Sequence, residues 1–367
     1  MKTIGTQVQF LRPDSRYCRR GEGAFLRLDS GAILNVYSAY PGPDWNDHAE
    51  AELAAQISDD GGKTWSPERT IIRRDPDAVN VMSVSLLPMQ DGAAGLFYIQ
   101  KYRREGRIVD RYLLRRSYDG GMTWGESSVC IPDTTYSIIN NDRVVRLSDG
   151  RIAIPVSQCE TDPDDPYRLS PGCVCLFLSD DDGRTFRQTQ ILRPPFINDE
   201  AGLQEPGVFE HADGTLRMWM RTALGFQFES FSHDGGETWT QPQPNFQFTS
   251  PCSPMQLKRA GAWTLAVFNP VPTPCAQFRP EGTFWKLAGR TPLVCAVSED
   301  GGESFRQMFC LESDPDSDYC YPAVFPLKDG ALISYYHSCG TRALLSGMKT
   351  VFVPYTELDA LCHTVGA

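Results

Sequence analysis

Short apolar runs alternate with Gly-containing turns along most of the chain. A representative stretch is Leu147–Ile154, in which Ser-Asp-Gly separates an apolar residue from an alternating apolar run. Similar turns recur at Gly31, Gly92, Gly150, Gly214, Gly261 and Gly330. Because Asp-Gly between two alternating apolar runs is a strong hairpin signal, these turns predict six β-hairpins.

A second pattern, the Asp box, has the form Ser-x-Asp-x-Gly-x-Thr/Ser-Trp/Phe. Its five copies are Ser58–Trp65, Ser117–Trp124, Ser179–Phe186, Ser232–Trp239 and Ser298–Phe305. The Asp can hydrogen-bond its own backbone in a tight turn, the Gly tolerates positive φ, and the aromatic residue packs beneath the turn. Spacings of 53 to 66 residues between the first residues of successive copies suit one four-stranded sheet with its loops.

Six hairpins and five Asp boxes together predict an all-β, six-bladed β-propeller with four-stranded antiparallel blades. The last blade begins near Tyr319 and has no Asp box, so it lacks a fourth strand. The N-terminal segment Thr6–Leu11 is the expected donor, because its pairing would close the ring and cover an open edge. We expect residues 1–367 to form one domain, with a short helix after Tyr355.

Composition narrows the possible partners. A hydrophobic content of 41% and a charged content of 22% are ordinary for a soluble globular protein, and no tract is long enough to cross a membrane. The formal net charge of −11 argues against nucleic-acid binding, because attraction to phosphates needs a basic face. A few converging arginines can still bind one carboxylate, since local geometry outweighs the global charge at short range.

The first residues and the cysteines bear on location and cofactors. Met1–Thr6 shows no signal-peptide pattern, so we expect a cytoplasmic protein, or a secreted one if a leader precedes this sequence. The 12 cysteines include no Cys-x-x-Cys pair, which favours buried reduced thiols. No metal, nucleotide or flavin motif is present, so no cofactor is expected.

The segment Glu205–Arg221 carries the most specific functional signal. A hairpin centred on Asp213-Gly214 places Glu205 and Arg221 near the same end of a blade, although an ordinary salt bridge at the rim would look similar. Together with the Asp boxes, this segment resembles the sialidase (neuraminidase) superfamily, glycoside hydrolase family 33-like, over nearly the whole chain. In that family a catalytic Glu opens the strand and an Arg closes the returning one.

The resemblance implies three arginines that bind a substrate carboxylate, because guanidinium groups suit planar oxyanions. Arg221 is the clearest match, and Arg290, eight residues before the fifth Asp box, resembles the later family arginine. For the first arginine we choose Arg20 and keep Arg19 open. The chain departs from the family here, since Gly21–Gly23 stands where Arg-x-Pro is usual, and a relative of sialic acid becomes a possible substrate.

The resemblance also implies the reacting groups. Asp47, in the loop before the first Asp box, is the candidate general acid, with Asp44 as the alternative. Tyr321, nine residues before the last turn glycine, is the candidate nucleophile, with Tyr319 as the alternative. Glu205 is the candidate base. A plain turn Asp and a strand aromatic are the structural alternatives for the first two.

A tyrosine nucleophile suits this substrate class, because a carboxylate would meet the like charge on the anomeric carbon of a sialic acid. A phenol with an ordinary pKa near 10 needs a base, here Glu205, while Asp47 protonates the leaving oxygen. The expected activity is a retaining exo-glycosidase acting on a terminal α-ketosidic bond. Asn141 and Asp142 are expected to touch sugar hydroxyls or the N-acyl group, although turn capping explains them equally well.

The expected partner is a small molecule or glycan with a carboxylate. Two other interpretations stay open: a glycosidase for a different anionic sugar, and a non-catalytic propeller that binds carbohydrate or protein. Convergence of the candidate residues at one end of the central channel would favour an enzyme, because catalytic groups must reach the reacting atoms.

Overall fold

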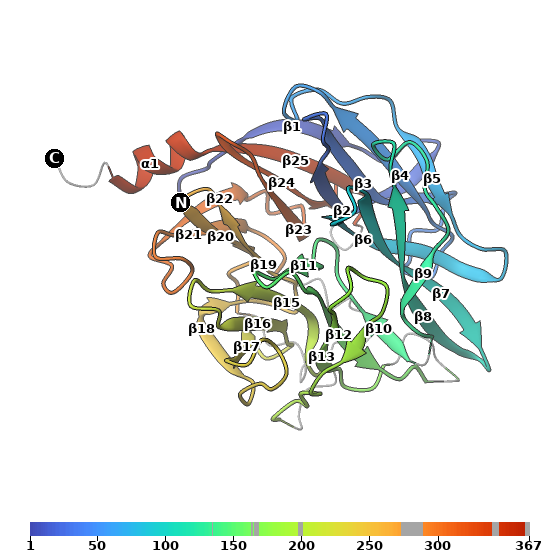
Figure 1. Ribbon diagram of the computed structural model, residues 1–367. Helices are drawn as coiled ribbons and strands as arrows, with labels where there is room; N and C mark the ends of the chain where they lie inside the picture. Colours follow the sequence, from blue (N-terminus) through green and yellow to red (C-terminus); the bar gives the residue numbers. More distant parts are fainter. Residues whose placement is uncertain are drawn as a thin grey trace.

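The computed structural model consists of antiparallel sheets arranged as blades around a central channel (Figure 1). The structure describes residues 1–133, 135–162, 164, 169–196, 201–272, 289–339 and 345–363. The six sheets confirm the prediction of an all-β, six-bladed propeller.

In four of the six blades the strands follow chain order from the centre of the ring outward (Figure 1). The first two blades contain β2 (Tyr17–Arg27), β3 (Ile33–Pro41), β4 (Glu52–Ser58), β5 (Arg69–Arg73), β6 (Ala78–Pro88), β7 (Ala94–Arg104), β8 (Arg107–Ser117) and β9 (Ser128–Ile131). The third blade contains β10 (Tyr136–Ile138), β11 (Val145–Arg146), β12 (Ile152–Cys159), β13 (Cys173–Ser179) and β14 (Arg187–Gln188). The fourth and fifth blades contain β15 (Gln204–Glu210), β16 (Leu216–Arg221), β17 (Phe226–Ser232), β18 (Gln243–Thr249), β19 (Gln256–Ala260), β20 (Trp263–Phe268), β21 (Leu293–Ser298) and β22 (Gln307–Glu312).

The sixth blade draws on both ends of the chain. It contains β23 (Tyr319–Pro326), β24 (Gly330–His337), β25 (Gly347–Pro354) and β1 (Thr6–Leu11). β1 pairs antiparallel with β25, so the N-terminal strand closes the ring as predicted. The expected C-terminal helix is α1 (Tyr355–His363), whose Leu358 is buried in the adjacent core.

The Asp boxes form turns with one shared geometry. In the first copy Ser58 Oγ donates to Asp60 Oδ1 over 2.8 Å and accepts the Gly62 N–H over 2.8 Å. The backbone N–H of Thr64 donates to the same Asp60 oxygen over 2.9 Å, and Trp65 Nε1 donates to the Gly62 carbonyl over 3.1 Å. Each box therefore links the third and fourth strands of its blade through a closed set of hydrogen bonds.

Four of the inner strands carry the same β-bulge near the end that faces away from their hairpin turn. Its first residue is Glu22, Ser83, Glu205 or Tyr321, with φ of 53°, 59°, 46° and 55°. A bulge places two residues opposite one and changes the direction of a side chain. These four residues therefore leave the normal in-and-out alternation of their strands.

The third blade reaches the channel differently. β10 and β11 both pair with β12, and residues 139–144 between them lie outside the ladder. Asp142 in this segment also has positive φ, at 55°. Within the described ranges no helix is long and apolar enough to span a membrane.

Candidate active site

Tyr321 and Glu205 meet across the channel, one from the sixth blade and the other from the fourth. Tyr321 Oη donates to Glu205 Oε1 over 2.8 Å. The other Glu205 oxygen lies 2.7 Å from Arg221 Nη1, and both side chains of this ion pair are buried. Burial raises the pKa of Tyr321 well above its usual value, and the neighbouring Glu205 carboxylate raises it further. The phenol is therefore protonated and hydrogen-bonded to a carboxylate.

Arg290 lies on the other side of Tyr321, with its guanidinium carbon 5.6 Å from the centre of the phenol ring. The side chain is buried and donates to Cys320 Sγ over 3.2 Å and to the Cys252 carbonyl over 3.0 Å. Among the residues that the structure describes, no carboxylate pairs with Arg290, and its Nε has no hydrogen-bond partner. A buried guanidinium without a counter-ion favours binding of an anionic ligand at this position.

Of the two candidates for the first arginine, Arg19 reaches the cluster and the Arg20 side chain does not. Arg19 donates to Tyr336 Oη over 2.8 Å, to Asp47 Oδ1 over 2.6 Å and to Glu22 Oε1 over 2.9 Å. The Arg20 side chain instead pairs with Asp14 and Glu68, at 2.7 and 2.8 Å. Neighbouring residues of a strand point to opposite faces, so only one of the two arginines can face the channel.

Asp47 lies at the mouth of this cluster, with 57% of its side chain exposed. Desolvation alone would raise the pKa of Asp47, but the cations of Arg19 and Lys101 outweigh it and hold this pKa below its usual range. Asp44 is exposed and bonds its loop neighbour Asn46, as a turn residue does. Asp47 is therefore the loop carboxylate that joins the cluster, and it is ionised in the free protein.

Asn141 and Asp142 lie beneath the strand that carries Tyr321. Asn141 Nδ2 donates to the Gly23 carbonyl over 2.9 Å and lies 3.4 Å from the Tyr321 carbonyl. Asp142 accepts the Val324 N–H over 3.0 Å and pairs with Lys258 at 2.5 Å. Their observed partners are protein groups, so these contacts support a bracing role for both residues.

A family profile for the BNR repeat-like domain matches residues 34–333. The chain belongs to this family. A search of curated proteins found no match for this BNR propeller.

Solved structures share the fold of this BNR propeller at low sequence identity. A protein of unknown function from Dyadobacter fermentans has a TM-score of 0.71 at 18% identity, covering 95% of this chain and 99% of its own. The Hadza microbial sialidase Hz136 has a TM-score of 0.72 at 16% identity, covering 96% and 69%. The intramolecular trans-sialidase from Ruminococcus gnavus, in complex with oseltamivir carboxylate, has a TM-score of 0.71 at 15% identity, covering 98% and 99%.

Glu22 is a residue of this BNR propeller site that the sequence analysis missed. Its buried carboxylate accepts from Ser83 Oγ over 2.6 Å in addition to Arg19, and burial raises the pKa of Glu22 while Arg19 opposes that rise. A signal was available, because Glu22 lies nine residues before its turn glycine, as do Glu205 and Tyr321. The shared bulge explains this spacing, because each of these residues is the first residue of the bulge on its strand.

Lys101 and Asp110 were also missed, and they lie opposite each other on β7 and β8. Lys101 Nζ donates to the Asp47 carbonyl over 2.9 Å and lies 5.4 Å from the centre of the Tyr136 ring. Asp110 is 1% exposed and accepts the Ser137 N–H over 3.0 Å, and burial raises the pKa of Asp110 to about 7. Both occupy ordinary strand positions, so no sequence pattern marked them.

Proposed function

We propose that this BNR propeller is a retaining exo-glycosidase that hydrolyses the terminal α-ketosidic bond of sialic acid or a related acidic sugar. The observation that carries the proposal is the hydrogen bond between Tyr321 and Glu205, flanked by Arg221 and Arg290. A protonated phenol beside a carboxylate base and two buried cations fits attack on an anionic sugar. The sialidase and trans-sialidase folds among the structural neighbours support the same proposal.

Substrate binding begins with the arginines. Arg290 has no carboxylate partner among the described residues, so it can take the substrate carboxylate directly. Arg19 is already paired with Asp47 and Glu22, so a substrate carboxylate must replace Asp47 there. Once Asp47 loses its cation partner, its pKa rises and it can carry the proton that a general acid needs.

Two displacements then complete the reaction. In the first, Tyr321 Oη attacks the anomeric carbon, Glu205 accepts the phenolic proton, and Asp47 protonates the leaving oxygen as the glycosidic bond breaks. In the second, Asp47 removes a proton from water, which attacks the same carbon, and Tyr321 leaves and regains its proton from Glu205. Two inversions give net retention of configuration.

The test is release of 4-methylumbelliferone from its α-sialoside by Tyr321→Phe and Glu205→Gln. Each variant should lose on the order of 10³-fold or more in kcat, because the nucleophile and its base act as one unit. Tyr319→Phe is the matched control, since Tyr319 lies on the same strand but packs against Tyr335 and His337. Full activity in both site variants, with the propeller still folded, would refute the proposal.

If the wild type leaves the sialoside intact, a panel of other anionic α-glycosides separates the remaining possibilities. Hydrolysis of one of them, abolished by Tyr321→Phe, would identify a different acidic sugar as the substrate. Binding without hydrolysis across the panel would indicate a carbohydrate-binding propeller instead.

A further inference from the structure

A cavity lies at the end of the central channel where the inner strands approach their hairpin turns. It has a volume of about 200 Å³, and we call it the rear chamber; its walls include Asp142, Arg143, Arg146, Trp219, Lys258 and Arg259. Glu205 stands at the start of β15, whereas Glu210 at the end of the same strand lines the rear chamber. The chamber therefore lies toward the opposite end of β15 from Glu205, and Arg143 stands between it and the candidate active site.

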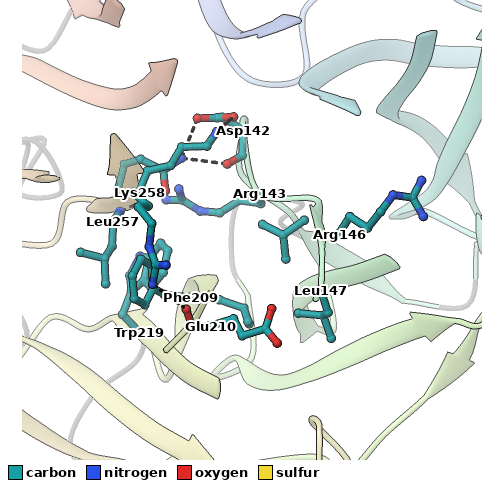
Figure 2. A pocket seen from close by; sticks show the side chains of 13 residues that line it. Asp142, Arg143, Arg146, Leu147, Phe209, Glu210, Trp219, Leu257 and Lys258 are labelled. Carbon is teal, nitrogen blue, oxygen red and sulfur yellow. Dashed lines mark hydrogen bonds and ion pairs between the residues drawn. The ribbon is translucent and has the colours of Figure 1, made fainter. Parts of the chain in front are cut away.

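The rear chamber concentrates positive charge in an acidic protein. Arg143, Arg146, Lys258 and Arg259 line it, against the carboxylates of Asp142 and Glu210 only, while the whole chain has a formal net charge of −11. Figure 2 shows Asp142, Arg143 and Lys258 gathered at one wall, with Leu147 and Glu210 across from them. The local excess of cations favours an anionic ligand at short range.

Two of these cations are neutralised by protein carboxylates. Lys258 pairs with Asp142 at 2.5 Å, and Arg146 pairs with Asp182 at 2.7 Å. The Glu210 carboxylate accepts a hydrogen bond from the backbone N–H of Ser148, over 2.7 Å, and another from the hydroxyl of the same serine.

Arg143 and Arg259 remain without a carboxylate in the described part of the chain. Arg143 is 1% exposed, and its Nη2 donates to the Met255 carbonyl over 2.6 Å. Its Nε and Nη1 have no partner among the described residues, and its guanidinium carbon lies 5.4 Å from the centre of the Trp219 ring. Burial lowers the pKa of Arg143 to about 10, which still leaves it charged at neutral pH.

Burying a cation whose N–H donors lack partners costs free energy. A bound oxyanion reduces this cost, because its oxygens accept hydrogen bonds from the unpaired guanidinium nitrogens. Arg259 also lines the chamber: its guanidinium carbon lies 5.5 Å from the centre of the Phe209 ring, and its Nη2 donates to the Glu210 carbonyl over 3.5 Å. Guanidinium groups suit carboxylate and phosphate oxygens, and the volume leaves room for such a group with water.

We propose that the rear chamber is a binding site for a small oxyanion, a phosphate or carboxylate group, held by Arg143 and Arg259. This site does not depend on the proposed glycosidase activity. It is tested with the whole protein by isothermal titration at pH 7 and constant ionic strength, using inorganic phosphate, acetate and chloride as separate probes.

The expected result is a saturable site for phosphate or acetate that persists in Arg290→Gln, and none for chloride. Arg143→Met and Arg259→Gln should each weaken that binding by about tenfold or more, because each removes a charge-assisted donor. Arg259 is exposed, so Arg259→Gln should fold even if Arg143→Met, which changes a buried residue, does not. Arg27→Gln, which removes an exposed arginine near the hairpin turn of another blade, is the matched control.

Arg290→Gln distinguishes the two ends of the channel, since it alters only the candidate active site. Binding to the rear chamber should survive this change. The proposal is overturned if neither oxyanion binds, if chloride binds equally well, or if Arg290→Gln abolishes binding while the two chamber variants leave it intact. A preference between phosphate and acetate identifies which oxyanion the chamber takes.

Discussion

At the scale of single residues, the site depends on side chains that local backbone geometry points into the channel. Glu205 and Tyr321 hold φ of 46° and 55°, a region that costs a non-glycine residue about 1–3 kcal/mol. The surrounding blades hold both residues in this conformation through their strand pairing on either side of the bulge. This conformation places the proposed base and the proposed nucleophile within hydrogen-bond reach of each other.

Arg19 and Arg20 offer a test on neighbouring residues. Arg19→Met should lower kcat/KM by on the order of 10²-fold, because it removes a proposed substrate contact and the partner of Asp47. Arg20→Met should instead lower the unfolding temperature, because it breaks two ion pairs away from the channel, and should leave KM unchanged. Steady-state kinetics and thermal unfolding of both variants check this contrast, and the reverse pattern would contradict the assignment of Arg19.

Asp110 gives a prediction about pH. Its pKa in the folded protein is raised to about 7, above the unfolded value near 4, so folding is favoured when this carboxyl is protonated. That contribution is present below about pH 4 and is lost as the pH rises through about 7.

Asp110→Asn keeps the shape of the side chain and its acceptor for the Ser137 N–H, but it cannot ionise. The variant should therefore gain stability relative to the wild type between pH 5 and 8, by on the order of 1–4 kcal/mol. Urea unfolding at several pH values measures the difference. A difference that stays constant with pH would contradict the raised pKa of Asp110.

At the scale of elements, the Asp box is a repeated turn whose parts can be removed singly. Ser58→Ala and Ser232→Ala each delete a buried hydroxyl that bonds the box Asp and the second box glycine. Each should cost about 1–2 kcal/mol in the free energy of unfolding and leave kcat unchanged. Similar losses in the two blades would show that the motif acts in the same way in each. Loss of activity without loss of stability would contradict a purely structural role.

The elements also show what the sequence could predict. Glu205, Arg221, Arg290 and Tyr321 gather as expected, because each lies at a fixed count from a turn or an Asp box, and turns set strand register. The Arg20 side chain does not reach the cluster, because a shift of one residue exchanges the two faces of a strand. The packing of Lys101 against Tyr136 joins different blades and depends on tertiary geometry that no local pattern carries.

At the scale of the whole molecule, stability should depend on closure of the ring. β1 covers the edge of β25, and the Ile4 N–H donates to the Cys310 carbonyl over 2.9 Å, which ties the N-terminal segment to the fifth blade as well. Deleting residues 1–11 should lower the unfolding temperature and promote association through the exposed edge. Thermal unfolding and size-exclusion chromatography check this, and an unchanged unfolding temperature and elution profile would show that β1 is dispensable.

The pairing of β1 with β25 also affects synthesis of the chain. Gln7 pairs with Val351, so β1 stays unpaired until the ribosome has synthesised 344 further residues. At about 5–20 residues per second, this interval is roughly 20–70 s. During that time the nascent propeller is an incomplete arc with two unpaired edges, and the polar glutamines of β1 reduce the risk that it pairs with another chain. The ring can therefore close only after β25 has left the ribosome.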